Sequence, residues 1–143
     1  KARKVLLEIA SLADIILPGI DEGNFMFGES DPYKLGELFL KQGAKLVVLK
    51  VGAKGAFYFT ENSAQLVAGF PVKTVVDPVG AGDGFAAGLI SGLLDQLPIE
   101  KAVQRGNAVG AFATQVQGDF EGLPDREELN RFMNQGERED INR

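Results

Sequence analysis

The chain has 143 residues, of which 45% are hydrophobic, and this length and composition suit one globular domain of ordinary size. It carries 15 basic and 20 acidic residues, a net charge of −5 without a basic cluster, so we expect no nucleic-acid partner. Cysteine and histidine are absent, which excludes disulfides, thiol nucleophiles, Cys/His zinc sites and a Ser–His–Asp triad. No apolar run approaches the roughly 18 residues that cross a bilayer, and no signal-peptide pattern is present, so we expect a cytoplasmic protein without a membrane partner.

The first part of the chain predicts alternating helices and strands. A helix over 1–13 has an apolar face at helical spacing, and a short buried strand is expected at 13–17. A second helix is predicted over 31–43, because it opens on Asp-Pro, an N-cap followed by proline at the first helical position, and ends on glycine. A second buried strand is predicted at 45–51.

Three short β-like runs follow and suggest antiparallel strands or hairpins: 56–60, 65–68 and 72–76. A glycine-rich turn then leads into an apolar helix that ends near Leu94, and a further helix is expected over 97–115. Asp125 and Glu128 form a capping box for a last helix. This order is an α/β pattern, in which a parallel sheet with helices on its faces is usual. The strands are few for a complete sheet, which suggests part of a larger unit.

The turn at 77–83, Asp-Pro-Val-Gly-Ala-Gly-Asp, is the most informative segment. Its small residues leave main-chain N–H groups uncovered where a helix begins, at the positive end of the helix dipole. Such a site suits a phosphate or the charge that develops in phosphoryl transfer. It is not a Walker loop, because no lysine follows, and not a dinucleotide fingerprint, because Phe85 stands where a glycine is required.

Asp83, at this helix start, has two interpretations. It is either a carboxylate that caps the helix or favours its dipole, or a base beside an anion site. A carboxylate repels phosphate, so it suits a site where it must accept a proton from an attacking hydroxyl. The glycines that follow at spacing four, Gly84, Gly88 and Gly92, predict a smooth face for close packing and not a chemical role.

The fourteen residues 77–90, Asp-Pro-Val-Gly-Ala-Gly-Asp-Gly-Phe-Ala-Ala-Gly-Leu-Ile, resemble the C-terminal signature of the ribokinase-like sugar kinases, the phosphofructokinase-B family. The order of Pro-Gly-x-x-Glu, Lys-Val-Gly-Ala-Lys-Gly, this signature and Arg-Gly-Asn-Ala-Val-Gly-Ala is similar to the C-terminal half of that family along nearly the whole chain. Within the family, 13–23 and 105–108 look most like 2-keto-3-deoxygluconate kinases. The resemblance implies a three-layer α/β/α fold with a mostly parallel sheet. Residues 1–143 would be its C-terminal nucleotide-binding and catalytic-base part, without the N-terminal sugar-binding part and the lid.

The resemblance also implies roles for individual residues. Asp83 would be the general base, and an anion hole would be formed by the amides of Gly80, Ala81 and Gly82. The nucleotide-binding positions would be Lys50, Gly52 and Gly55 at the ATP phosphates and Asn107 beside the adenine. A lysine and two turn glycines at a strand end, and a polar residue on a solvent-facing helix, are the plain structural interpretations of these positions.

Two metal positions are implied as well. Glu22 corresponds to the glutamate of the family's Asn-x-x-Glu motif, which influences Mg²⁺ at the phosphates, although Gly19 stands where asparagine is usual. Asp77 with the carbonyl of Val79 resembles a site for a monovalent cation such as K⁺. The alternatives are an acidic pair near a helix start for Glu22 and its neighbour, and a turn aspartate before proline for Asp77.

The resemblance implies ATP-dependent phosphorylation of a sugar acid. The favoured reaction is the conversion of 2-keto-3-deoxygluconate to its 6-phosphate. The implied cofactors are ATP and Mg²⁺, with K⁺ as a further candidate, and a homo-oligomer of the full-length enzyme is an expected assembly. Two alternatives stay open: a ribokinase-like kinase for another small sugar such as fructose or ribose, and a catalytically incompetent nucleotide-binding fragment.

Overall fold

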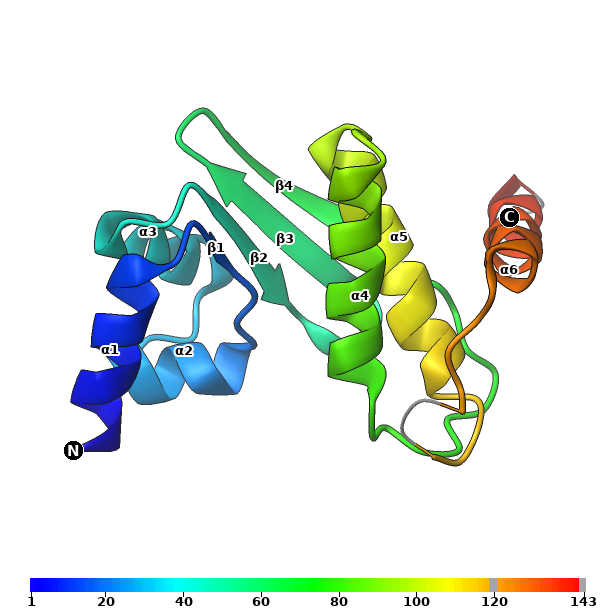
Figure 1. The fold of residues 1–143 in the computed structure, drawn as a ribbon, viewed down its shortest axis with the longest axis horizontal. Helices are drawn as coiled ribbons and strands as arrows, with labels where there is room; N and C mark the ends of the chain where they lie inside the picture. Colours follow the sequence, from blue (N-terminus) through cyan, green and yellow to red (C-terminus); the bar gives the residue numbers. More distant parts are fainter. Residues whose placement is uncertain (119–120, 142–143) are drawn as a thin grey trace. The chain divides into compact units, whose positions relative to one another are not determined.

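The computed structural model describes residues 1–118 and 121–141, and the chain divides into two compact units, Lys1–Val67 and Ala68–Arg143. The part of the chain up to Ala68 contains both helices and strands, and helices follow (Figure 1). The α/β class expected from the sequence is therefore confirmed. None of the helices within the described residues is long and apolar enough to cross a membrane.

A four-stranded sheet organises the first unit. The elements up to Ala68 are, in chain order, α1 (Ala2–Leu12), β1 (Ile15–Ile16), α2 (Ile20–Phe27), α3 (Pro32–Gln42), β2 (Leu46–Lys50), the 3₁₀ turn η1 (Gly52–Lys54), β3 (Gly55–Thr60) and β4 (Ser63–Ala68). The strand order is β1-β2-β3-β4, with β1 parallel to β2 and β2 antiparallel to β3. A two-residue turn at 61–62 joins β3 to β4. The described sheet is thus mixed, and the expected buried strand at 45–51 is its β2.

The core of this unit lies between the sheet and its helices. Val47 and Leu49 of β2 are fully buried and belong to one apolar cluster with Leu35 and Phe39 of α3. The position of α3 is specified locally, because the Asp31 side chain accepts a hydrogen bond from the Lys34 N–H at 2.9 Å and proline follows the cap. The N-cap expected from the sequence is confirmed, and it orients the helix whose apolar face covers the sheet.

Two closely packed helices dominate the second unit, which contains α4 (Ala81–Leu94), α5 (Ile99–Ala113) and α6 (Arg126–Ile141). Helices α4 and α5 lie side by side (Figure 1). A Cβ on Gly88 would lie 2.8 Å from the carbonyl oxygen of Arg105, and one on Gly92 would lie 2.7 Å from the Cα of Ala102. The prediction that the glycines of α4 serve close packing is confirmed for Gly88 and Gly92, where a Cβ would collide with the backbone of α5.

Polar contacts tie the ends of these helices. Asp125 and Glu128 exchange backbone-to-carboxylate hydrogen bonds of 2.8 and 2.9 Å, so the capping box of α6 is confirmed. Just after α4, Asp95 accepts from Arg105 at 2.7 Å and from Arg126 at 3.1 Å. These hydrogen bonds hold the pKa of the Asp95 carboxyl below its ordinary value, Arg105 contributing most.

Two local expectations are wrong, and one helix is missing from the expected elements. Residues 72–76 form no strand; within the described part of the chain, the Val76 N–H bonds to the Thr114 carbonyl at 2.8 Å instead of to a neighbouring strand. The buried strand expected at 13–17 shrinks to β1, and Ile15 is 43% exposed because β1 is the edge of the sheet. Helix α2, only hinted at by its acidic pair, was absent from the expected elements.

Candidate functional site

The loop before α4 is shaped by one aspartate and one glycine. The Asp77 carboxylate accepts a hydrogen bond from the Val79 N–H at 3.0 Å, an Asx turn that spans Pro78. Gly80, the N-cap of α4, has φ 78° and ψ −12°, the left-handed conformation that residues with a side chain rarely adopt. The turn role considered for Asp77 is therefore observed, and glycine at position 80 is explained by backbone geometry.

This loop ends at a helix start whose backbone donors are largely unused. The Ala81 N–H donates to the Pro78 carbonyl at 3.3 Å, a long bond. Within residues 1–118 and 121–141, no acceptor is recorded for the N–H groups of Gly80, Gly82 and Asp83. These donors, at the positive end of the helix dipole, suit an anion. Of the three amides expected to form an anion hole, two are available and that of Ala81 is partly engaged.

The Asp83 side chain stands in the first turn of α4, at the same point. It is exposed, and no described residue donates a hydrogen bond to its carboxylate. The capping interpretation requires a bond between this carboxylate and a free backbone N–H of the helix start, and no such bond forms. A proton acceptor with unused lone pairs therefore stands beside unused backbone donors.

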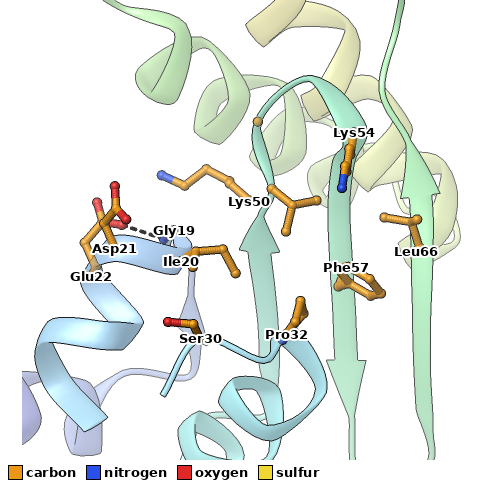
Figure 2. Close-up of a pocket in the computed structure, with 12 residues that line it drawn as sticks. Gly19, Ile20, Asp21, Glu22, Ser30, Pro32, Lys50, Lys54, Phe57 and Leu66 are labelled. Carbon is orange, nitrogen blue, oxygen red and sulfur yellow. Dashed lines mark hydrogen bonds between the residues drawn. The ribbon is translucent and has the colours of Figure 1, made fainter. Parts of the chain in front are cut away.

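In the first unit, an open cavity of about 710 Å³ lies where the carboxyl end of β2 meets the start of α2 (Figure 2). Its wall includes Gly19, Glu22, Lys50 and Gly52, which the sequence singles out, whereas Gly55 is not part of it. Figure 2 shows apolar side chains, including Phe57, on the β3 side of the cavity and acidic side chains on the α2 side.

Backbone pairing brings the two sides of this cavity together. Gly19 forms an isolated parallel bridge with Lys50, and the Lys50 N–H donates to the Pro18 carbonyl at 2.8 Å. After β2 the chain turns through η1, where Gly52 and Gly55 have φ values of 63° and 110°. Positive φ thus explains both glycines. At position 52 the wall of the cavity is backbone without a side chain.

The charges of the cavity face one another. Lys50 extends from the end of β2 toward Asp21 and Glu22 of α2, and Lys54 stands on the opposite side (Figure 2). In the described part of the chain, neither lysine makes an ion pair, so both ammonium groups are available to an anionic ligand. Sequence reasoning missed Asp21 and Lys54 as lining residues, although Lys54 belongs to the Lys-Val-Gly-Ala-Lys-Gly motif.

Asn107 lies in α5, in the second unit, and is only 7% exposed. Its side-chain N–H donates to the Ala68 carbonyl at 3.1 Å. The alternative of a solvent-facing polar residue is therefore wrong. The Asn107 amide thus has a structural role, because it donates a hydrogen bond to a backbone carbonyl from a buried position. Its position beside an adenine stays a prediction.

The helices, the mixed sheet and the two glycine-shaped turns define a ribokinase-like α/β fold. The crystal structure of a putative ribokinase II from Escherichia coli in complex with ATP and Mg²⁺ superimposes with a TM-score of 0.85 at 33% identity, over 93% of this chain and 43% of that one. A fructokinase from Vibrio cholerae O395, solved with fructose, ADP and calcium, gives a TM-score of 0.84 at 32% identity, over 92% and 44%.

A family model for pfkB family carbohydrate kinases matches residues 1–126, and the chain belongs to this family. One relative is the 2-dehydro-3-deoxygluconokinase of Bacillus subtilis (strain 168), 49% identical over 126 residues, which are 88% of this chain and 39% of that protein. The chain thus spans about two fifths of the length of this relative. The resemblance drawn from the signature at 77–90 is confirmed.

Proposed function

We propose that the protein containing this chain transfers the γ-phosphoryl group of ATP to a hydroxyl of a sugar acid, 2-keto-3-deoxygluconate, giving the 6-phosphate. The observation that carries the proposal is the start of α4, where the unbonded Asp83 carboxylate stands beside the unused N–H groups of Gly80 and Gly82. A site that only binds an anion gains nothing from a carboxylate there, so this pairing favours catalysis over a non-catalytic nucleotide-binding module.

The chemistry follows from these groups. Asp83 accepts the proton of the sugar hydroxyl as its oxygen forms a bond to the γ-phosphorus, and the bond from that phosphorus to the bridging oxygen of ADP breaks. The charge on the transferring group is stabilised by the backbone donors of Gly80 and Gly82, with a smaller share from Ala81 because its N–H is partly engaged. The positive end of the α4 dipole adds to this stabilisation.

The cavity beside β2 suits the phosphates of the nucleotide. Lys50 supplies a point charge, and the turn at Gly52, without a side chain, permits close approach of a phosphate to the backbone. Gly55 serves by shaping this turn. Lys54, in the wall of the same cavity, supplies a second positive charge for the phosphates.

The donor set of this cavity fits Mg²⁺ held with a nucleotide. The described residues contain no group of three or more acidic or other side chains able to hold a metal alone. Mg²⁺ in such sites keeps waters and takes one or two carboxylates together with phosphate oxygens, a requirement that Glu22 and Asp21 meet. When bound, the ion neutralises phosphate charge and orients the triphosphate. The roles of Asn107 beside the adenine, and of Asp77 and Val79 at a monovalent cation such as K⁺, stay predictions.

The sugar acid is supported by the 49% identity to the Bacillus subtilis 2-dehydro-3-deoxygluconokinase. A neutral sugar is the second candidate, because the structural neighbours named for ribokinase and fructokinase superimpose with TM-scores of 0.85 and 0.84. A panel of 2-keto-3-deoxygluconate, fructose, ribose and adenosine, tested with the full-length protein, separates these candidates. A higher kcat/KM for a neutral sugar contradicts the sugar-acid assignment.

The role of Asp83 is tested by ADP release from the full-length protein. We expect Asp83→Asn to lower kcat by about 10²–10⁴-fold, the usual contribution of a positioned general base, with little change in the KM for ATP. Asp14→Asn is the matched control, since it removes the same charge from an exposed ion pair with Lys45 in the other unit. Equal turnover by wild type and Asp83→Asn would refute the assignment.

A further inference from the structure

Gly19 and Glu22 form a local arrangement at the start of α2. Gly19 is the N-cap of this helix, and its backbone N–H donates to the Glu22 carboxylate oxygen Oε2 at 2.8 Å (Figure 2). This is one half of a capping box, the half in which the acid at the third helical position reaches back to the cap. The other half is impossible here, because glycine has no side-chain acceptor.

The backbone does not require glycine at this position. Gly19 has φ −99° and ψ 174°, an extended conformation open to any residue. The three atoms nearest to an added Cβ would all belong to the Glu22 carboxyl group: Oε2, which would overlap with it, then Cδ at 3.4 Å and Oε1 at 3.8 Å. The absence of a side chain at position 19 therefore determines where the Glu22 carboxylate lies.

A second helix start also combines a glycine cap with an acid three residues later. Gly80 is the N-cap of α4 and Asp83 is its third residue, yet no hydrogen bond joins the Asp83 carboxylate to the Gly80 N–H. Two features differ between the sites: Gly80 is left-handed whereas Gly19 is extended, and aspartate is one methylene shorter than glutamate. The two sites thus hold their carboxylates differently: bound to the cap at α2 and unbound at α4.

The bond at Gly19 matters because of Lys50. The backbones of Gly19 and Lys50 are bridged, so the Glu22 carboxylate is anchored next to the strand end from which the Lys50 side chain extends. Figure 2 shows Lys50 reaching toward α2, yet Glu22 and Lys50 form no ion pair within 4 Å. A carboxylate released from the cap would be drawn to this lysine, and the pair would neutralise the cation that the cavity offers to phosphate.

We propose that Gly19 is a positioning residue: because it has no side chain, the Glu22 carboxylate lies in the space that a Cβ would fill, at the rim of the cavity and apart from Lys50. A side chain at the cap does not prevent the bond itself, since Glu128 bonds in the same way to the Asp125 N–H of α6. The inference concerns Gly19, the first residue of the Gly-x-x-Glu sequence at 19–22. Its effect on ligand binding rests on the proposed function, whereas the position of Glu22 does not.

The binding test uses Mg²⁺ and ADP as probes with the full-length protein. We expect Gly19→Ala to raise the Mg²⁺ concentration that half-saturates ADP binding by about tenfold, as is usual when a carboxylate loses its orienting partner. If Gly19 acts through Glu22, Gly19→Ala adds nothing in a Glu22→Ala background. In a matched Asp21→Ala background, which removes an acid of the same turn, the tenfold effect persists. An equal effect of Gly19→Ala in the wild-type and Glu22→Ala backgrounds would overturn the proposal.

A second measurement is independent of nucleotide. The amide proton resonance of Gly19 reports its bond to the carboxylate, so we expect it to move upfield in Glu22→Ala and to stay in place in Asp21→Ala. An unmoved resonance in Glu22→Ala contradicts the inference. Failure of the wild-type protein to bind ADP with Mg²⁺ contradicts the proposed function instead, and the Gly19 resonance then decides on the inference by itself.

Discussion

The packing of α4 on α5 makes a quantitative prediction for two glycines of one helix. A Cβ on Gly88 would meet backbone: the Arg105 carbonyl oxygen at 2.8 Å and the Gly106 Cα at 3.0 Å, with a Val109 methyl at 2.9 Å. The three atoms nearest to a Cβ on Gly84 would all belong to side chains, the closest a Leu123 methyl at 3.3 Å. The same substitution by alanine therefore forces two backbones apart at one position and makes near-ordinary contacts at the other.

The magnitudes follow from two opposing effects. Alanine is favoured over glycine within a helix by about 1 kcal/mol, whereas overpacking a tight interior costs about 1–3 kcal/mol. For Gly88→Ala the overpacking is near the upper end of that range because backbone atoms cannot rotate away, so we expect a net loss of about 1–2 kcal/mol. For Gly84→Ala the helix preference dominates, and we expect no loss or a gain of up to about 1 kcal/mol.

Urea unfolding of the full-length protein measures both effects. We expect the urea midpoint to fall for Gly88→Ala and to stay or rise for Gly84→Ala. An unchanged m value, the slope of the unfolding free energy against urea concentration, shows that the variant changes stability without changing the surface exposed on unfolding. If the two variants lose equal stability, close backbone approach is not the reason for glycine at position 88, and the reasoning fails.

Two further predictions concern polar contacts of the second unit. Because the pKa of Asp95 is lowered in the folded protein by hydrogen bonds from Arg105 and Arg126, this carboxylate stabilises the fold above its unfolded pKa, and the contribution is lost as the pH falls through the folded value. Asp95→Asn should therefore lower the Tm at pH 7, and the difference from wild type should shrink below about pH 4; a constant difference would contradict this assignment. Asp125→Ala, which removes the cap of α6, should cost about 1 kcal/mol by urea unfolding. Glu127→Ala, in the same turn and outside the capping box, is its control, and equal losses would show that the cap contributes nothing specific.

Features that depend on residues close in sequence were predicted well. The cap of α3 at Asp31 and the capping box at Asp125 and Glu128 each join groups three residues apart, so their geometry is contained in the local pattern. The glycine stripe of α4 was predicted for the same reason, because spacing four places its members on one helix face.

Strands were predicted less well, since a strand exists only with a partner. Residues 45–51 and 72–76 are both rich in valine, yet only the first has neighbours on both sides and becomes β2. The second segment, without a strand beside it in the described structure, is a loop with bends. A valine-rich segment does not specify which other segment it pairs with, and this pairing decides whether it becomes a strand.

The candidate site shows the same division. The sequence by itself determined the glycine-shaped turn at 77–83, the position of Asp83 at a helix start and the family, because the signature is contiguous along the chain. The structure adds that Glu22 is bound to its own helix cap and Asp83 is not, although each carboxylate lies three residues after a cap and the contact is local. Only the tertiary structure decided that Gly19 pairs with Lys50, which makes two acids and two lysines line one cavity. This parallel pairing joins segments about thirty residues apart, and neither segment contains a local pattern that specifies its partner. Long-range register therefore becomes known only from the fold, unlike local capping.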